Sequence, residues 1–546
     1  MRMFLRVIGL LCWLASIISC QNPVNSKNNK QKPNVVFIIC DDLNDAIGGI
    51  GMGGHPQALT PNLDKMINEG VSFSNAQSNC PVCGPSRASL WSGLYPHSTG
   101  YFGYKQQQYH WRNNEVLKNS VTLVEHLAAN DYQVYGTGKI HHNGHEDFSV
   151  FNNKDGSNGF EVGPSFGPYP WDGDPAKAAV NIRGVKHPDL PEAYESNSCW
   201  DSFGPVKNLS ETMKGKGTWL YNHDEEEYRY VSEDDRDLMP DERCVEYVKE
   251  VLADEHKNPF FLAVGFNRPH SPCYVPEKYF DMFPLETLEL APYLVNDLAD
   301  CAPSLWKTLD VGMGATGFQK YDKLDKVGKD MLLRWTQAYL ACVAFVDDQI
   351  GQTIEAIKSS PYGDNTIIVV TSDHGYHMGE KEYIFKNSLW EESARVPLIF
   401  QGPGVAKGQS CEVPVSLIDI YPTMIDLCGL PGEPNVNGNQ KKIDGYSLVP
   451  LLLNPVKGQW SGNDYAITAI ASSEALAKDE SAKPETQHYS IRTKKYRYVL
   501  CRNGEEELYD HSGDPYEWKN VAGQEQYMAD KLRLKEIIIN TCYKNK

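Results

Sequence analysis

The chain has 546 residues, of which 41% are hydrophobic, and its formal net charge is -19. A chain of this length is too long to fold around one small hydrophobic core, so we expect one large domain and a smaller one. Because phosphate binding needs a basic face, the acidic balance argues against nucleic acid as a partner. The acidic chain would also repel an anionic substrate at long range, so a site for one must gather its cations locally, within about one Debye length of roughly 8–10 Å.

The first twenty residues predict an export signal. Residues 7–18 form an apolar run that is too short to span a bilayer. Cys20 follows a small residue and resembles a bacterial lipobox, so we expect a lipoprotein-type signal over residues 1–20, with ordinary cleavage nearby as the alternative. Residues 21–33 are polar and predict a flexible tether. From this signal we expect an exported protein. It would lie in the periplasm, at the outer membrane through a lipid anchor, or at the cell surface.

Four continuous apolar runs predict buried strands of a parallel sheet, in which both faces are covered. They are residues 34–40, 260–264, 366–371 and 396–400. Helical patterns lie at residues 62–70, 123–130, 241–253 and 329–357. Strands that alternate with helices predict an α/β fold, with a mostly parallel sheet flanked by helices on both faces.

Two later regions differ from this pattern. Residues 148–230 are irregular and rich in Gly, Pro, Asp and aromatics, which predicts a wall of a substrate cleft. From Trp460 onward, strand patterns flank a turn at Asn503-Gly504 and precede a terminal helix, which predicts a short antiparallel sheet. We therefore expect a large domain over residues 34–459 and a smaller C-terminal α+β subdomain over residues 460–546.

Acidic pairs follow two of the predicted strands. Asp41-Asp42 ends the first strand and Asp373-His374 ends the third. Since the carboxyl ends of such strands meet at one edge, both pairs should lie together. A lone Asp pair is more often a cap or a solvated turn, but two such pairs favour a metal. Oxygen donors suit Ca²⁺ or Mg²⁺, and the histidine makes Zn²⁺ the competitor.

The run Cys83-Gly84-Pro85-Ser86-Arg87 carries a candidate nucleophile. We expect a helix to start at Ser86-Arg87, which places Cys83 near a helix N-terminus that favours anions. A structural or disulfide role for Cys83, with Cys80 as partner, is the alternative. Of the 14 cysteines, Cys40 and Cys342 lie in apolar stretches and are expected to be buried free thiols.

Local cations and histidines recur beside the predicted strand ends. Lys139, His141 and His142 follow one strand pattern, and His270 follows another. Lys386 lies thirteen residues after Asp373. Each alone is usually a solvated charge or a structural histidine, but together they supply the cations that an acidic chain needs around an anion.

These motifs together resemble the type I, formylglycine-dependent sulfatases, and within them the iduronate-2-sulfatase-like branch. The resemblance extends over about residues 34–522. The segments that carry it are NVVFIICDDLND, CGPSRASLWSG, GKIHHNG, PFFLAVGFNRPHSP, TSDHGYHMGE with Lys386, ARVPLIF and SLIDIYPTMIDLCGL. It implies an alkaline-phosphatase-like fold with a smaller C-terminal subdomain, and hydrolysis of sulfate esters.

The resemblance also implies roles for site residues. A formylglycine-generating enzyme would convert Cys83 to formylglycine, whose hydrate attacks sulfur. The implied ligands of one Ca²⁺ are Asp41, Asp42, Asp373, His374 and the converted Cys83. Arg87 and Lys139 would steady the hydrate, and His142 would take the proton of its second hydroxyl. His270 and Lys386 would contact sulfate, with His270 as the acid for the leaving alcohol.

Departures from the human-type pattern lie in the parts that should contact the sugar, so iduronate specificity does not carry over. We expect a sulfated oligo- or polysaccharide substrate, such as ulvan, carrageenan, fucoidan or glycosaminoglycan fragments. Candidate sugar-facing residues, with ordinary packing as the alternative, are Tyr101, Tyr104, Trp111, Arg112 and Trp171.

Two other functions stay open. One is a phosphoester hydrolase or transferase of the same superfamily, which typically uses Thr or Ser and two zinc ions. The other is a non-catalytic, glycan-binding surface lipoprotein, if Cys83 stays unmodified.

Overall fold

The computed structural model describes residues 32–48, 54–103, 110–142, 150–151, 166–172, 185–190, 202–209, 213, 217–221, 226–306, 326–435, 441–472 and 482–543. Pro33–Lys546 forms one compact unit. The predicted signal and nearly all of the predicted tether lie outside the described residues. The boundary between residues 459 and 460 stays a prediction. No helix of the described part is both long and apolar enough to cross a membrane.

A seven-stranded sheet forms the centre of this unit, in the order β18-β2-β17-β13-β1-β11-β4. Its strands are β1 Asn34–Asp41, β2 Val71–Phe73, β4 Gln133–Gly138, β11 Phe260–Pro269, β13 Thr366–Ser372, β17 Leu398–Gln401 and β18 Gln409–Cys411. β1 lies between β11 and β13 and runs parallel to both. The prediction of a mostly parallel sheet is confirmed, and three of the four predicted runs form the adjacent parallel strands β13, β1 and β11.

The fourth predicted run differs in direction. β17 pairs antiparallel with both β13 and β2, so the expectation of a parallel strand over residues 396–400 is wrong. Between β13 and β17 the chain forms only short elements, the longest helix being α11 Glu391–Ala394. A parallel connection needs a crossover of a dozen or more residues that returns to the opposite end of the sheet. Here the chain turns back at the same end.

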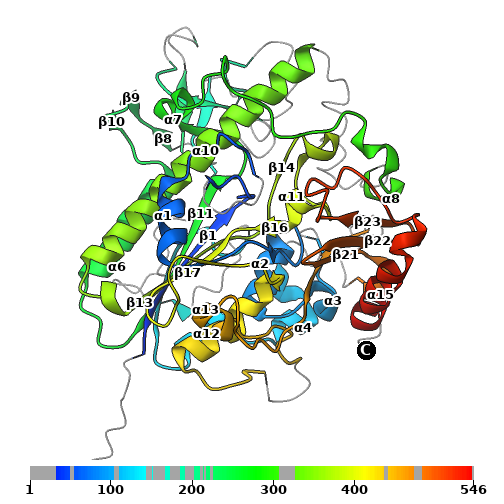
Figure 1. The fold of residues 1–546 in the computed structure, drawn as a ribbon. Helices are drawn as coiled ribbons and strands as arrows, with labels where there is room; N and C mark the ends of the chain where they lie inside the picture. Colours follow the sequence, from blue (N-terminus) through cyan, green and yellow to red (C-terminus); the bar gives the residue numbers. More distant parts are fainter. Residues whose placement is uncertain are drawn as a thin grey trace, which may run out of the picture. The chain divides into compact units, whose positions relative to one another are not determined.

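Alternate residues of β1 enter two separate cores, as expected for a strand covered on both faces. Val36 and Ile38 pack with α1 Pro61–Glu69, α6 Pro240–Ala253 and α10 Lys326–Ser359. Val35 and Phe37 pack on the other side, where the helices are α2 Cys83–Ser92, α5 Leu123–Ala128, α12 Ile420–Cys428 and α13 Val449–Leu453. Figure 1 shows the two groups of helices on either side of the sheet.

The C-terminal antiparallel sheet is also confirmed. Its strands follow chain order and are β20 Tyr465–Ile470, β21 His488–Thr493, β22 Tyr496–Leu500 and β23 Glu506–Asp510. Gly504 has a φ of 88° at the predicted turn between β22 and β23, a conformation that glycine adopts without a steric cost. α15 Met528–Ile538 lies beside this sheet (Figure 1). It contributes Leu534 and Ile538 to the core of the sheet.

Several short elements complete the described chain. They are β3 Ala76–Gln77, α3 Pro96–Thr99, α4 Glu115–Lys118, β5 Tyr169–Trp171, β6 Phe203–Val206, β7 Thr218–Leu220, β8 Glu227–Tyr228, β9 Tyr230–Ser232, β10 Asp235–Arg236, β12 Cys273–Pro276, α7 Glu277–Asp281, α8 Pro303–Trp306, β14 His377–Met378, β15 Ile384–Phe385, β16 Arg395–Val396 and β19 Val415–Ser416. The predicted irregular stretch thus holds short strands, and much of it lies outside the described residues.

The N-terminus of α1 is capped from another helix. Thr60, which precedes α1, makes no side-chain cap. Instead Asp347 of α10 accepts hydrogen bonds from the backbone N–H groups of Leu63 (2.8 Å) and Asn62 (3.0 Å). These are donors that a helix cannot satisfy by itself, so Asp347 joins α1 to α10 as well as capping it.

We expect Asp347→Ala to lower the free energy of unfolding by about 2–3 kcal/mol, because it leaves donors without an acceptor at a helix contact. Urea unfolding followed by circular dichroism measures the loss. Glu355→Ala, an exposed position on the same helix, should change stability by less than about 0.5 kcal/mol. Equal losses in the two variants would contradict this account of the cap.

Candidate active site

The two acidic strand ends meet, as their positions predicted. β1 and β13 are neighbours, with Cys40 opposite Ser372, so the residues that follow lie side by side. The backbone N–H of Asp42 donates to Asp373 Oδ1 at 3.3 Å, and His374 Nδ1 lies 3.3 Å from Asp42 Oδ1. All four side chains of the two pairs are buried. The sheet edge therefore carries a compact group of three carboxylates and one imidazole.

Cys83 lies against this group. Its Sγ is 3.2 Å from His374 Nε2, 3.2 Å from Lys386 Nζ and 3.4 Å from Asp41 Oδ1. The residue is 3% exposed and begins α2, three residues before the predicted helix start. The N-terminus of a helix favours negative charge, so α2 adds to the attraction for an anion at this point.

The alternative of a disulfide between Cys80 and Cys83 does not hold. Cys80 Sγ donates to the carbonyl oxygen of Phe102 at 3.4 Å. Each of the eleven cysteines within the described residues is buried and forms no disulfide, and Cys40 and Cys342 are among them, as predicted.

Three cations balance the three carboxylates. Arg87 Nε donates to Asp373 Oδ2 at 2.8 Å, Lys386 Nζ to Asp42 Oδ1 at 2.7 Å, and Lys139 pairs with Asp41. Each of these side chains is at most 4% exposed. The Arg87 guanidinium also donates to the backbone carbonyls of Lys139 and Ile140, which fixes its orientation.

Burial and charge compete in setting the pKa values of the site. Burial raises the pKa of the Cys83 thiol, but Lys139, Lys386 and His374 outweigh it and hold this pKa well below its ordinary value. For His374, burial lowers the pKa, but the charges of Asp373 and Cys83 outweigh burial and raise this pKa to about 9. For Asp373, burial prevails and raises the pKa to about 6. Negative charge is thus favoured at the Cys83 position.

The predicted histidines also lie here. His270 Nε2 is 3.8 Å from Asp42 Oδ2 and 4.0 Å from Asp41 Oδ2. Burial lowers the pKa of His142, which is partly offset by a hydrogen bond with Cys83. His141 instead stacks on Trp111, with ring centroids 4.9 Å apart. The structure therefore places His142 rather than His141 beside the candidate nucleophile, and His142 is the residue to which the family resemblance gives a role there.

The candidate sugar-facing residues divide differently. Tyr101 and Trp111 are buried in a small apolar cluster, so the packing alternative holds for both. Arg112 pairs with Glu125 at 2.5 Å and donates to the carbonyl oxygen of Leu117, which is a structural role. Trp171 is half-buried in β5, and Tyr104 lies outside the described residues.

Phe166 is a site residue that the sequence did not single out. Its ring centroid lies 4.7 Å from that of His270, and Lys139 Nζ lies 4.8 Å from the Phe166 centroid. The side chain is half-buried. The only signal for it was the aromatic, Gly- and Pro-rich composition of the stretch that contains it.

The acidic edge fits a bound cation. Donor atoms of Asp41, Asp42, Cys83 and His374 lie within 4.8 Å of one another. Asp42 Oδ2 is buried and accepts no hydrogen bond in the described structure, which is costly unless a cation meets it. Asp373 lies beside them, with Oδ1 accepting from backbone N–H groups and Oδ2 from Arg87.

A second cluster of potential ligands has a different character. Glu391, His511 and Glu517 lie within ligand distance of one another. Arg497 donates to both glutamates, and Arg492 Nε lies 3.1 Å from Glu391 Oε2. The acidic groups are therefore already neutralised, and the cluster is an ion-pair network.

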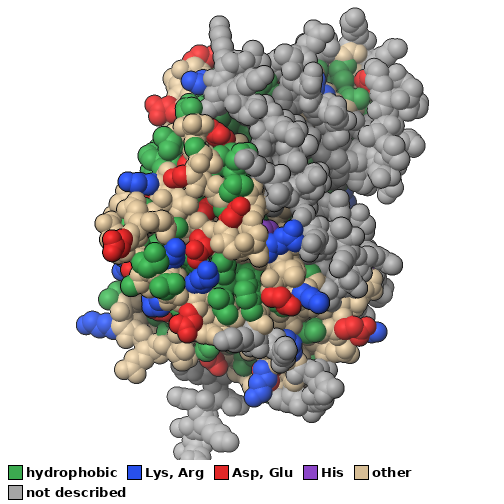
Figure 2. Space-filling view, turned by 90° about the vertical axis from the view of Figure 1, so that its right-hand side faces the viewer, with side chains coloured by type: hydrophobic (Ala, Val, Ile, Leu, Met, Phe, Trp, Pro, Cys, Tyr) green, Lys and Arg blue, Asp and Glu red, His purple; other side chains and the backbone are tan. Residues whose placement is uncertain are grey.

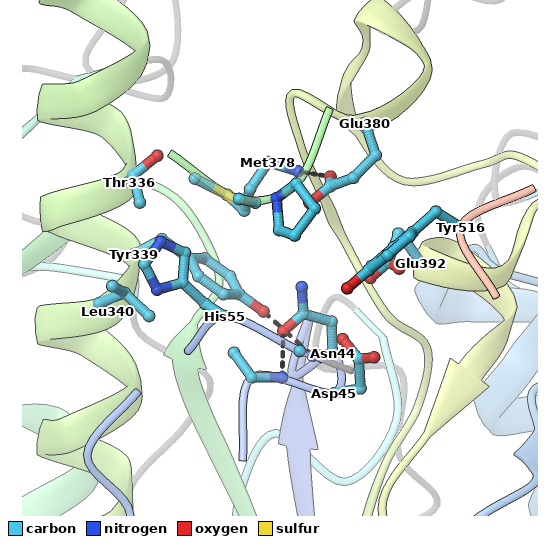
Figure 3. Close-up of a pocket in the computed structure, with 14 residues that line it drawn as sticks. Asn44, Asp45, His55, Thr336, Tyr339, Leu340, Met378, Glu380, Glu392 and Tyr516 are labelled. Atoms are coloured by element: carbon cyan, nitrogen blue, oxygen red, sulfur yellow. Dashed lines mark hydrogen bonds between the residues drawn. The ribbon is translucent and has the colours of Figure 1, made fainter. Parts of the chain in front are cut away.

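The pocket drawn in Figure 3 is separate from the Cys83 site. Asp45, Glu380 and Glu392 point into it from three segments, with Tyr339 on the α10 side. Burial, with the nearby charge of Asp45, raises the pKa of Glu392 well above its ordinary value. The two sites share a wall, because the Tyr339 hydroxyl donates to the carbonyl oxygen of Asp42 at 2.7 Å. None of the predicted catalytic or metal residues lines this pocket.

Charged residues are distributed differently outside the site. On the face in Figure 2, acidic and basic side chains are interspersed, and no broad basic area is visible among the coloured residues.

Comparisons with known proteins identify the family and agree with the fold. The sulfatase family model matches residues 33–430, and the model for the C-terminal part of N-sulphoglucosamine sulphohydrolase matches residues 379–544. A sulfatase of Formosa agariphila is 34% identical over 96% of this chain and 90% of its own. An ulvan-active sulfatase of the same organism is 26% identical over 94% and 82%.

Among solved structures, the phosphonate monoester hydrolase of Agrobacterium radiobacter superposes with a TM-score of 0.65. It is 22% identical, and the match covers 93% of this chain and 95% of that one. The fold is therefore alkaline-phosphatase-like.

The chain belongs to the sulfatase family, since the family model covers most of its length and a sulfatase matches it nearly end to end. It is a sulfuric ester hydrolase. The iduronate-2-sulfatase-like branch stays a prediction, because the matching model describes the family as a whole.

We expect Arg87→Met to lower the free energy of unfolding by about 3–5 kcal/mol, because it leaves Asp373 buried without its cation. Urea unfolding measures this loss. Lys249→Met, which removes an exposed pair with Glu246, should cost less than about 1 kcal/mol. A loss for Arg87→Met as small as that of the surface variant would show that Asp373 does not depend on it.

Proposed function

We propose that this protein hydrolyses sulfate esters of a sulfated carbohydrate, with Cys83 converted to formylglycine as the nucleophile. The observation that carries the proposal is the position of Cys83 Sγ within 3.4 Å of a carboxylate, an imidazole and an ammonium group. The thiol stands in for the formylglycine hydrate. That group would supply one hydroxyl to attack sulfur and a second to release the sulfate.

One Ca²⁺ is the proposed metal, held by Asp41, Asp42, Asp373, His374 and the converted Cys83. Conversion replaces sulfur by oxygen at that position, so four of the five donor groups would be oxygen ligands, which favours calcium over zinc. When bound, the ion would polarise a sulfate oxygen and orient the ester. Because three cations already balance the three carboxylates, a divalent ion would leave the site with a net positive charge for sulfate.

The remaining roles follow from position. Lys139 and Lys386 both hold positive charge near Cys83, where the sulfate group would lie. Arg87 donates a hydrogen bond to Asp373, which fixes its guanidinium in the position where it would stabilise the hydrate. His142 adjoins Cys83 and would take a proton from the hydroxyl there. His270 lies near the Oδ2 atoms of Asp41 and Asp42 and would protonate the leaving alcohol.

A carbohydrate is the proposed bearer of the sulfate. Support comes from the similarity to an ulvan-active sulfatase over nearly the whole chain. Phe166 contacts His270 and offers an aromatic face beside the proposed leaving group, where a pyranose ring would stack. Algal polysaccharides such as ulvan, or glycosaminoglycan fragments, are the proposed substrates. A formylglycine-generating enzyme is the proposed maturation partner, and export with a lipid anchor at Cys20 stays a prediction.

The alternatives are less well supported. A two-zinc phosphoester hydrolase needs a second group of ligands beside the first. Within the described residues, the other ligand cluster is the network around Glu391, which Arg492 and Arg497 already neutralise. A glycan-binding protein without activity would need Cys83 to stay a thiol.

We expect the mature protein to release sulfate from at least one member of a panel of ulvan, carrageenan, fucoidan and glycosaminoglycan oligosaccharides. Cys83→Ala should fold normally and release none, because the nucleophile is gone. Mass spectrometry of the peptide across residue 83 should find a mass about 18 Da below that of cysteine. Turnover of a phosphate monoester in place of sulfate, full activity of Cys83→Ala, or an unmodified thiol in active protein would each refute the proposal.

We expect Ca²⁺ at 100 times its dissociation constant to stabilise the mature protein by about 2.7 kcal/mol, and EDTA to reverse this. Thermal unfolding measures the shift. Asp42→Asn should abolish it, because Asp42, whose Oδ2 accepts no hydrogen bond, loses its charge. Asp348→Asn, on α10 away from the site, should respond to Ca²⁺ like the unmutated protein. Stabilisation by Zn²⁺ but not by Ca²⁺ would contradict the choice of metal.

A further inference from the structure

Arg497, in β22 of the C-terminal sheet, contacts both segments that carry the centre of the site. Its Nη2 donates to Gln77 Oε1 at 3.1 Å, six residues before Cys83. Its Nη1 donates to the carbonyl oxygen of Leu389 at 3.0 Å, three residues after Lys386. A single planar guanidinium therefore links the chain that leads into Cys83 with the chain that leads out of Lys386.

The Arg497 side chain is itself rigidly held. It is fully buried. Its Nε donates to Glu517 Oε1 at 2.6 Å, and its Nη2 also pairs with Glu391. Glu517 continues the link, because its Oε2 accepts from the backbone N–H of Glu391 at 3.0 Å. Because the guanidinium is planar and its N–H donors have fixed directions, it sets the distance between its partners. A flexible lysine ammonium group does not do this.

The segment that carries Lys386 needs such support. Lys381, Glu382 and Asn387 have φ values of 57°, 51° and 66°, in the left-handed region that residues other than glycine seldom adopt. Such conformations persist where the surrounding structure determines them, and they are frequent at functional sites. Trp390 Nε1 donates to Glu507 Oε2 at 2.9 Å, so a second residue of the C-terminal sheet holds the same segment.

We propose that Arg497 is a positioning residue, which sets the place of Lys386 relative to Cys83 without touching the substrate. The inference deepens the proposed function, because it rests on the sulfate-contacting role of Lys386. The structure assigns the C-terminal sheet a part in catalysis through this contact. Lys386 Nζ meets Cys83 Sγ at 3.2 Å and Asp42 Oδ1 at 2.7 Å, and both distances depend on the path of residues 386–391.

The test is a double-mutant cycle of Arg497→Lys and Lys386→Ala, measured as sulfate release from the most active oligosaccharide of the panel. Lys386→Ala should act mainly by raising KM, because it removes a contact to bound sulfate. Arg497→Lys keeps the charge but loses the fork, and should lower kcat/KM by about 10- to 100-fold, again mainly through KM. In the Lys386→Ala background the same change should cost less than about threefold, because the group it positions is absent.

Arg492→Lys is the matched control. Arg492 lies on the neighbouring strand β21 and also pairs with Glu391. Within the described part of the chain, Arg492 forms no hydrogen bond with Gln77 or Leu389. It should therefore keep kcat/KM within about twofold. Conversion of Cys83 is verified by mass spectrometry in every variant, and folding by circular dichroism at the assay temperature.

Gln77→Met provides a second route if Arg497→Lys does not fold. It removes the contact near Cys83 while keeping the side-chain length, and should reproduce the rise in KM. The inference is overturned if Arg497→Lys or Gln77→Met keeps normal kinetics, if the two losses of the cycle simply multiply, or if Arg492→Lys loses as much. If Lys386→Ala itself keeps normal kinetics, the proposed role of Lys386 fails first, and the two failures are distinguishable.

Discussion

Asp41, Asp42 and Asp373 are all but excluded from water, and an isolated carboxylate in such a place carries a desolvation cost of several kcal/mol. The structure offsets this cost with one cation for each carboxylate, supplied by Lys139, Lys386 and Arg87. Since the partners come from separate segments, the fold cannot close around the acids without bringing these cations to Cys83. The interactions that make the edge stable are therefore the same ones that make it suited to an anion.

This arrangement also reconciles an acidic protein with an anionic substrate group. A net charge of -19 repels sulfated chains at long range, and that repulsion is screened within about 8–10 Å at physiological salt. Inside the site, water is largely excluded and the local cations act with little screening. The neighbouring pocket around Glu380 and Glu392 differs from the Cys83 site. There burial is the largest influence on the two carboxyl groups, and it raises their pKa values.

Much of the central fold could be predicted from the sequence, because buried parallel strands are continuous apolar runs and the acidic pairs follow them directly. The direction of β17 could not, since it depends on how the short elements before it pack. The sequence also indicated that Cys83, Arg87 and the two lysines belong together, mainly through the family resemblance. For Phe166 it offered only the composition of the surrounding stretch, and for Arg497 it offered no sign, because their importance lies in contacts with residues that are distant in the chain. Tyr101 and Trp111 show the reverse case, in which aromatic residues near the motif only fill space.

The depth of Cys83 has a consequence for the order of events in the life of the protein. At 3% exposure, beneath the ends of two strands and the Lys386 segment, its sulfur is out of reach of another macromolecule. A converting enzyme would have to act on the nascent or newly translocated polypeptide, before the sheet assembles over the motif. Chains that fold faster than they are oxidised would be trapped as inert copies with a native shape. With conversion as proposed, the yield of active molecules would depend on the relative rates of folding and modification.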